Sequence, residues 1–288
     1  MIRFLLFACL LPVFSACIKN NPDPSWLEVS AWTLQANSEL SNSEGELTHN
    51  ISEAWVFIDD QTIGVFQLPF KIPILKSGMC NIKIYTAIKN NGIAATKKIY
   101  PFLEVFEVNQ TLTQNQTLTL NPITKYKSAT QFWIEDFEGV NINLTNDPNT
   151  SVAQYELENQ NLQSFNGNFY GKVSLSSQDS VWVANTETQL SIAKGRDAYL
   201  EIDYHNTNSL TTGLIFVSSS GVTNNTNIRL NAQSAESVVW KKIYIELKEL
   251  IGASPESSNF LQSFSCYIDE GQTNTEIKID NIKVVYFN

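Results

Sequence analysis

The sequence predicts an all-β protein built from two β-sandwich domains. Apolar stretches that alternate with polar residues recur at intervals of about 8–12 residues, which is typical of a sandwich. Helical periodicity is weak almost throughout the chain. Charged residues make up only 17% of the 288 residues, and Asn, Thr, Ser and Gln take their place. This composition suits an exported β protein, and the length is enough for about two domains.

The first 17 residues read MIRFLLFACLLPVFSAC and predict an export signal. Arg3 supplies a positive start, and residues 4–14 form an apolar stretch shorter than the ~20 residues that span a bilayer. Ser15-Ala16-Cys17 resembles the lipobox of bacterial lipoproteins, although Phe14 stands where leucine is usual. The resemblance implies a signal peptide of residues 1–16 and a lipid on Cys17. The alternative is an ordinary secretory signal that contains a cysteine.

A short polar tether, residues 17–25, would join the lipid to the folded body. An acylated cysteine carries enough methylene groups for stable anchoring in a membrane. Ile18 is not the acidic residue that, in this class of lipoproteins, retains the protein in the inner membrane. We therefore expect an outer-membrane location, either on the periplasmic face or on the cell surface. Asp179-Ser180-Val181 also matches a short O-glycosylation pattern of Bacteroidetes-like secreted proteins.

The first domain is predicted over residues 26–121. Residues 55–58 and 62–66 predict a hairpin around Asp59-Asp60-Gln61. Asn90-Asn91-Gly92 is a strong turn signal. Further strands are predicted at residues 26–34, 82–88, 100–108 and 111–120.

This half contains AWVFIDDQTIGVFQLPFKIPIL, then Gly78, then NIKIYTAIKNNGI. The order loosely resembles PEGA-type and carboxypeptidase-regulatory-like β-sandwich modules. The resemblance implies a domain that spaces or mediates contacts and is not catalytic.

Residues 122–131 predict a linker, because Pro122 and a small polar cluster interrupt the apolar rhythm. A second β domain is predicted over residues 132–288. The alternation shifts its parity across Asp280-Asn281, which predicts a β-bulge there. The Asn- and Thr-rich residues 222–227 predict a loop.

Four segments of the second domain carry a more specific resemblance. They are WIEDFEG (133–139), AYLEIDY (198–204), WKKIYIEL (240–247) and IKIDNIKVVYF (277–287). Their order resembles the galactose-binding-like jelly roll of carbohydrate-binding modules. The resemblance implies a jelly roll that binds a glycan, in which Glu138 and Asp280 lie side by side and hold a structural calcium ion. The alternative is that both acids cap turns or face solvent. No other cofactor is expected.

Sugar-binding sites stack an exposed aromatic ring on the apolar face of a sugar. Tyr170 and Trp182, in polar surroundings rich in Gly and Ser, are the predicted ligand-binding residues. The alternative is that both rings pack in the core, as large aromatics commonly do.

The residues give little support to catalysis. The body holds only His49 and His205, and no CxxC, HExxH, GxSxG or phosphate-binding glycine loop occurs. Glu201 and Asp203 share a strand face about 7 Å apart, a spacing that glycoside cleavage can use. A solvated strand face explains them equally simply. We therefore expect no enzyme.

Net charge limits the classes of binding partner, and the cysteines allow one possible cross-link between the halves. A net charge of −10 repels phosphate backbones, so no nucleic-acid partner is expected. Cys80 and Cys266 either form a disulfide between the halves or remain two buried thiols. These features predict a non-enzymatic, lipid-anchored envelope protein that binds a glycan through its second domain. The alternative is a structural lipoprotein whose two sandwiches contact protein partners.

Overall fold

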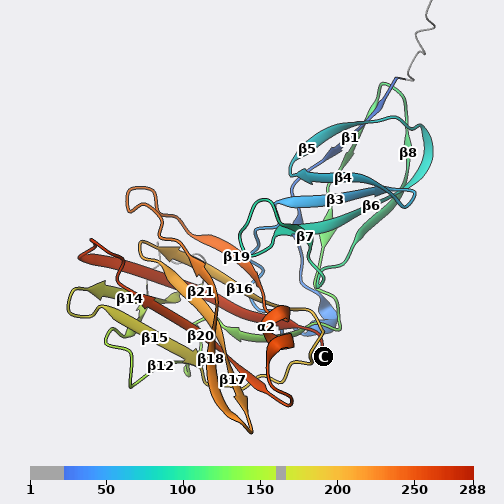
Figure 1. Cartoon of the computed structure of the whole chain (residues 1–288). Coiled ribbons are helices and arrows are strands. Elements are labelled where there is room, and N and C mark those ends of the chain that lie inside the picture. The colour runs from blue at the N-terminus through green and yellow to red at the C-terminus, as the bar shows by residue number, and fades with distance from the viewer. Residues whose placement is uncertain (1–22, 160–166) are drawn as a thin grey trace, which may run out of the picture.

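The computed structural model describes residues 23–159 and 167–288 and confirms the all-β prediction (Figure 1). Most strand pairs in both halves are antiparallel, but in the first half residues 26–29 pair in parallel with 117–120, and 33–34 with 123–124. Both halves contain very little helix. Among the described residues, no helix is long and apolar enough to cross a membrane. Cys17 and the export signal lie outside the described residues, so their assignment stays a prediction.

The elements of the first half are short strands and one 3-10 turn. They are β1 (Ser25–Val29), β2 (Thr33–Leu34), η1 (Ser38–Leu40), β3 (Glu53–Ile58), β4 (Gln61–Gln67), β5 (Phe70–Ile74), β6 (Gly78–Lys89), β7 (Lys97–Ile99), β8 (Phe106–Leu112), β9 (Thr117–Leu120) and β10 (Ile123–Thr124).

The second half has longer strands and one short helix. They are β11 (Gln131–Glu135), β12 (Leu144–Asn146), β13 (Tyr155–Asn159), β14 (Phe169–Ser176), β15 (Val181–Thr186), β16 (Ala198–Asn206), β17 (Leu210–Ser218), β18 (Gly221–Leu230), β19 (Lys241–Glu246), α2 (Lys248–Ala253), β20 (Asn259–Tyr267) and β21 (Asn274–Tyr286).

The first sandwich packs two sheets around an apolar core. One sheet has the order β4-β3-β6-β7, with β8 also paired to β6, and the other has the order β5-β1-β9. The predicted β3–β4 hairpin is confirmed, since Ile58 pairs with Gln61 across a two-residue turn. Asp59 and Asp60 both adopt positive φ, as the tight hairpin turn requires.

The second sandwich faces a six-stranded sheet with a five-stranded sheet. The first has the order β13-β14-β21-β16-β19, with β11 also on β21, and the second has the order β12-β15-β20-β17-β18. Inward rows from both sheets are fully buried in one core, for example Ile202 of β16 and Leu214 of β17. The strands β18 and β19 end these two orders and lie on the same side of the sandwich, where the Asn227 amide of β18 donates to the Glu246 carbonyl of β19.

The predicted β-bulge at Asp280-Asn281 is confirmed. Glu201 pairs with Lys283 while Asp203 pairs with Asp280, so β21 carries one extra residue between these two pairs. Asn281 has a φ of 46°, the left-handed conformation that such an insertion uses.

The loop predicted at residues 222–227 is wrong, because this segment lies inside β18 and pairs with β17. An edge strand exposes most of its side chains, so its composition can be as polar as that of a loop. The segment 122–131 contains β10, which pairs with β2, and a buried Tyr126. Residues 127–129 are exposed, so the segment combines short paired and buried stretches with an exposed one.

Candidate functional site

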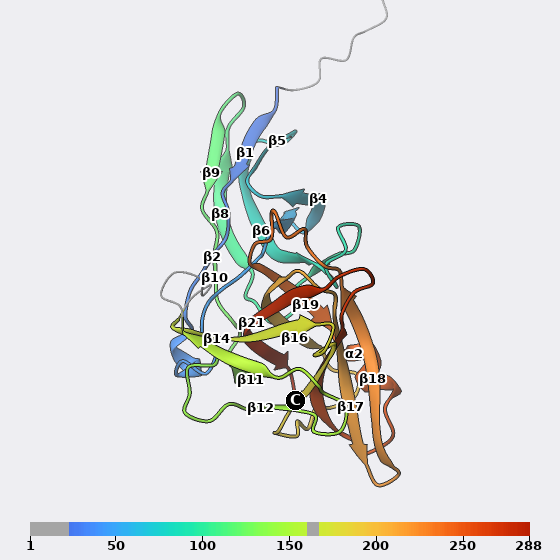
Figure 2. The ribbon, with the colours of Figure 1, turned by 90° about the vertical axis from the view of Figure 1, so that its left-hand side faces the viewer.

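The predicted Asn90-Asn91-Gly92 turn docks against the second sandwich. Asn90 forms a parallel bridge with Tyr244 of β19, and the Asn91 backbone N–H donates to the Tyr244 carbonyl at 2.9 Å. The Glu246 backbone N–H donates to Asn91 Oδ1 at 2.8 Å. The turn of one domain thereby satisfies polar groups on an otherwise free sheet edge of the other (Figures 1 and 2).

Glu201 lies at the centre of a buried network between the two sandwiches. Tyr100 and Tyr126 donate hydrogen bonds of 2.5 and 2.8 Å to Glu201 Oε1. Lys242 Nζ lies 3.3 Å from Glu201 Oε2. Burial by itself raises the pKa of Glu201, but Lys242, Lys283 and the two tyrosine hydroxyls outweigh it and hold the pKa below its usual value. The solvated strand face predicted for Glu201 is therefore wrong.

The neighbouring carboxylates Asp203 and Asp280 are also buried, directly opposite each other on β16 and β21. Thr48 Oγ1 donates to Asp203 Oδ2 at 2.6 Å, and Lys242 Nζ lies 3.7 Å from Asp203 Oδ1. Asp280 Oδ1 accepts from the Asn281 backbone at 2.7 Å, while Oδ2 has no hydrogen-bond partner among the described residues. Burial, reinforced by the charge of Asp203, raises the pKa of Asp280 to about 8. The folded protein therefore favours the protonated form of Asp280 near neutral pH.

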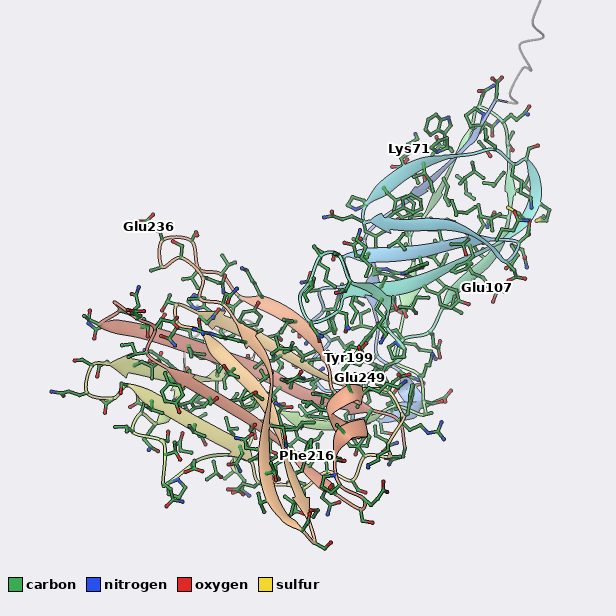
Figure 3. All side chains as sticks on the ribbon, in the orientation of Figure 1. Lys71, Glu107, Tyr199, Phe216, Glu236 and Glu249 are labelled. Carbon is green, nitrogen blue, oxygen red and sulfur yellow. The ribbon has the colours of Figure 1, made fainter. Side chains whose placement is uncertain are left out.

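Lys283 extends the same network toward the first domain. Its Nζ donates to the carbonyl of Glu44 at 2.6 Å and also to the carbonyl of Glu46. Burial lowers the pKa of Lys283 to about 8. Tyr199, Tyr244 and Val285 of the second sandwich complete the contact by joining the apolar core of the first; Figure 3 labels Tyr199 at this junction. The two sandwiches thus share one continuous, hydrogen-bonded interface.

An open groove lies beside this interface, between the docked turn and the edge strands β18 and β19. It consists of two hollows of about 640 and 230 Å³ that share four lining residues: Gly92, Tyr204, Lys241 and Ile243. The smaller hollow adds Lys89 and Asn50 from the first domain. The larger hollow adds amide side chains from β18 and the chain that follows it, including Asn227, Asn231 and Gln233.

Tyr204 and Lys241 are cross-strand partners on the groove floor. The ring of Tyr204 is half-buried against the core of the second sandwich, and no described residue hydrogen-bonds its hydroxyl. Burial raises the pKa of Tyr204. Ile93 adds an exposed apolar side chain from the opposite wall. The groove therefore combines the partly exposed Tyr204 side chain with the Lys241 ammonium and the Asn231 amide, whereas the amides of Asn227 and Gln233 already donate within the protein.

The structure corrects the prediction that Trp182 and Tyr170 offer exposed rings. Both residues are fully buried. Trp182 stacks on Phe264 in the core and donates from Nε1 to Asn146 Oδ1 at 2.8 Å. Tyr170 lies on the outer face of the six-stranded sheet, where Trp240 packs edge-on against its ring and its hydroxyl bonds Glu158. Core packing, the alternative for both rings, holds for Trp182, whereas Tyr170 is buried on the outer sheet face and belongs to neither core.

The calcium site proposed for Glu138 and Asp280 stays a prediction, because it needs loop carbonyl ligands in addition to the two acids. Both oxygens of Glu138 accept hydrogen bonds from Asn168, and Oε1 also accepts one from the Phe169 backbone. Within residues 23–159 and 167–288, no three His, Cys, Asp or Glu side chains are grouped to hold a metal ion. Calcium needs about six oxygen ligands, which these two acids do not supply alone.

Cys80 and Cys266 are both free and buried, which decides between the two alternatives for this pair. Each thiol packs in the core of its own sandwich. Burial raises the pKa of Cys266 and of Cys80, so both thiols stay protonated and unreactive at neutral pH.

Sequence reasoning missed the groove because its residues meet only through pairing of distant segments. One signal was present in WKKIYIEL, where Lys241 shares the inward parity of Ile243 and Ile245. A charged residue on an inward row indicates a strand end that opens to solvent. The role of Asn91 and Gly92 as a docking element, in contrast, has no local signature beyond that of a turn.

Comparisons with known proteins give likenesses of low similarity. No protein-family model and no curated protein matches the sequence. Among solved structures, a carbohydrate-binding module of the β-sandwich superfamily has a TM-score of 0.40 and 13% identity, covering 81% of this chain and 85% of that chain. A xylan-binding domain, CBM22-1, from Paenibacillus barcinonensis has a TM-score of 0.39 and 11% identity, covering 56% and 97%. The family 11 carbohydrate-binding module of a Clostridium thermocellum cellulase has a TM-score of 0.36 and 16% identity, covering 52% and 91%. The solved structures to which this chain is similar thus include carbohydrate-binding modules of the β-sandwich type.

Proposed function

We propose that this chain is a non-enzymatic, lipid-anchored envelope protein that binds a glycan in the groove between its two sandwiches. The observation that carries the proposal is the placement of Tyr204 and Lys241, side by side on the floor of an open groove. The Tyr204 side chain is partly exposed there, and its hydroxyl has no hydrogen-bond partner among the described residues.

The chemistry of the groove suits a saccharide. An aromatic ring packs against the C–H face of a sugar, and amide or ammonium groups bond its hydroxyls. Tyr204 supplies the ring, while Asn231, Lys241 and the rim serines Ser234 and Ser237 supply polar groups. A hollow of about 640 Å³ also lies within the usual size range of ligand sites, which often form at domain junctions.

The buried network supports the proposal by fixing the two walls of the groove relative to each other. One wall belongs to the first domain, through Gly92 and Ile93, and the other to the second. Because Glu201 and Lys283 join the domains beneath the groove, little freedom has to be lost when a ligand binds. Preorganisation of this kind raises affinity without additional contacts.

The proposed anchor would hold this groove close to a membrane. A lipid on Cys17 is only eight residues from the start of β1 at Ser25, a reach of at most about 28 Å. The short tether would display both sandwiches next to the outer membrane. The anchor is a proposal from the sequence, and its test is independent of the groove.

A second candidate function, contact with an envelope protein, rests on one surface feature. Leu75, on the loop between β5 and β6, and Met79, at the start of β6, are strongly exposed. This loop lies beside the start of β1, because the Ser25 hydroxyl donates to the Lys76 carbonyl. Exposed apolar residues at the tethered end fit a contact with a neighbouring protein.

A glycan panel with the purified protein separates the two candidates. We expect binding to at least one polysaccharide, with a loss of at least about tenfold in Tyr204→Ala. Asn231→Trp, a change of an exposed residue, should block the groove without touching the core. The matched control is Tyr267→Ala, which removes an exposed tyrosine outside the groove and should leave affinity unchanged. Binding that survives both groove variants, or a panel without any binding, would contradict the proposal.

A further inference from the structure

The groove differs from the rest of this acidic protein in its charge. The chain carries 29 acidic and 19 basic residues. None of the described residues that line the two hollows is an aspartate or a glutamate, yet they include Lys89, Lys241 and Arg229. Three other hollows on the molecule each contain at least one carboxylate, among them Asp179, Glu256 and Asp269.

Two of these cations have no acidic partner among the described residues and are available to bind an anionic ligand. Lys89 and Lys241 form no ion pair with any residue in the part of the chain that the structure describes, whereas lysines elsewhere, such as Lys98 and Lys172, are paired with acids. Arg229 is paired with Asp269 on the rim. Lys242, which lines the smaller hollow, is neutralised by Glu201 and Asp203.

The one acid of strand β19, Glu246, is already bonded to residues of the first domain. Glu246 of β19 is held by Asn90 and by Lys98 of the first domain. It therefore does not offset the charge of Lys241, which lies at the other end of the same strand. Lys89 and Lys241 come from different domains and line the same hollow, so an anionic ligand would contact both sandwiches.

We propose that the ligand of this groove is an anionic polysaccharide, one whose sugar units carry carboxylates or sulfate esters. The inference rests on the proposed glycan-binding function and specifies its ligand class. Unpaired ammonium groups form charge-assisted hydrogen bonds with such substituents, and Tyr204 packs against the sugar ring between them. In a protein of net charge −10, long-range repulsion disfavours acidic polymers, so a local site free of carboxylates is needed to bind one.

The test compares polymers that share a backbone and differ in charge. Polygalacturonate is paired with its fully methyl-esterified form, and dextran sulfate with neutral dextran; alginate and hyaluronan extend the acidic set. We expect the protein to bind at least one acidic polymer at least about tenfold more tightly than the neutral partners. This preference should shrink as salt rises from about 50 to about 500 mM.

The variants test the two lysines. Lys241→Glu and Lys89→Glu should each lower affinity for the acidic polymer at least about tenfold, and Lys241→Arg should retain it. Lys71→Glu is the matched control, because it changes the net charge equally on β5, far from the groove (Figure 3). Equal binding of the neutral polymers would overturn the anionic class while leaving the proposed function standing. A panel without any binding would overturn both, and an equal loss in Lys71→Glu would show a general charge effect and overturn the role of the groove.

Discussion

The hydroxyl of Tyr100 donates a 2.5 Å hydrogen bond to Glu201, from the core of one sandwich to the sheet face of the other. Tyr126 donates to the same oxygen at 2.8 Å. The negative charge of Glu201 also offsets the buried positive charges of Lys242 and Lys283. Glu201 therefore stabilises two buried cations and links the two domains. The interface is therefore part of the folding unit and not a loose contact between modules.

Replacing Glu201 by alanine should destabilise the whole protein. The change leaves Lys242 and Lys283 buried without the counter-charge of Glu201. Removing one partner of a buried ion pair costs about 3–5 kcal/mol of stability. Tyr126→Phe, which removes only one donor, should cost about 1–2 kcal/mol. Urea unfolding at neutral pH measures both. Glu236→Ala, on an exposed loop that projects away from the sandwich (Figure 3), is the control and should be neutral. A Glu201→Ala protein as stable as this control would contradict the role of the network.

Asp280 predicts an unusual dependence of stability on pH. Its pKa is about 8 in the folded protein and near 3.8 in the unfolded chain, so the folded state binds the additional proton between these values. The contribution of Asp280 to the free energy of unfolding is therefore greatest below pH 4 and falls as the pH rises to about 8. Between pH 5 and pH 8 the loss should be on the order of 2–4 kcal/mol.

Asp280→Asn isolates this contribution, because asparagine has nearly the same shape and does not titrate. Urea unfolding of both proteins at pH 5 and pH 8 gives the difference that belongs to Asp280. We expect the variant to gain stability relative to the wild type as the pH rises. If the two proteins follow parallel curves, Asp280 is ionised in the folded state and the protonated form assigned to it is wrong.

The all-β class, the β3–β4 hairpin and the bulge at Asp280-Asn281 could be predicted from the sequence, because each leaves a local signature. Alternation marks a strand, paired aspartates mark a tight turn, and a shift of parity marks an inserted residue. The strand β18 was missed because it lies at a sheet edge and exposes most of its side chains.

The candidate site was far less predictable. The periodicity of β16 distinguishes its two faces but not what covers them, so Glu201 and Asp203 had the same pattern as a solvated face. The first domain covers that face, through contacts such as Thr48 with Asp203 that join residues 155 positions apart. The burial of Trp182 and Tyr170 likewise depends on partners, Phe264 and Trp240, that local sequence does not specify.

The lipid anchor can be tested separately from the fold. Labelled palmitate should enter the wild-type protein in cells and should be absent from Cys17→Ala, because acylation requires the thiol. Cys9→Ala is the matched control, since it removes the other cysteine of the leader and should keep the label. Equal labelling of the wild type and Cys17→Ala would contradict the lipoprotein assignment.

Gly92 tests how the docked turn shapes the groove. It has a φ of +73°, and a Cβ there would lie 2.9 Å from Ile243 Cδ1 on the groove floor. Gly92→Ala should therefore add a steric cost, limited because Cδ1 ends a flexible side chain, to the backbone strain of about 1 kcal/mol.

The control for Gly92→Ala is Gly195→Ala, where φ is +78° and nothing lies within 4 Å of the added carbon. Both variants carry the backbone strain, so the difference between their unfolding free energies reports the contact with Ile243 alone. Because the added methyl pushes the turn away from β19, Gly92→Ala should also weaken ligand binding in the groove, whereas Gly195→Ala should not. Equal destabilisation together with unchanged ligand binding would mean that the added methyl is accommodated without a change in the groove, and would contradict this role of Gly92.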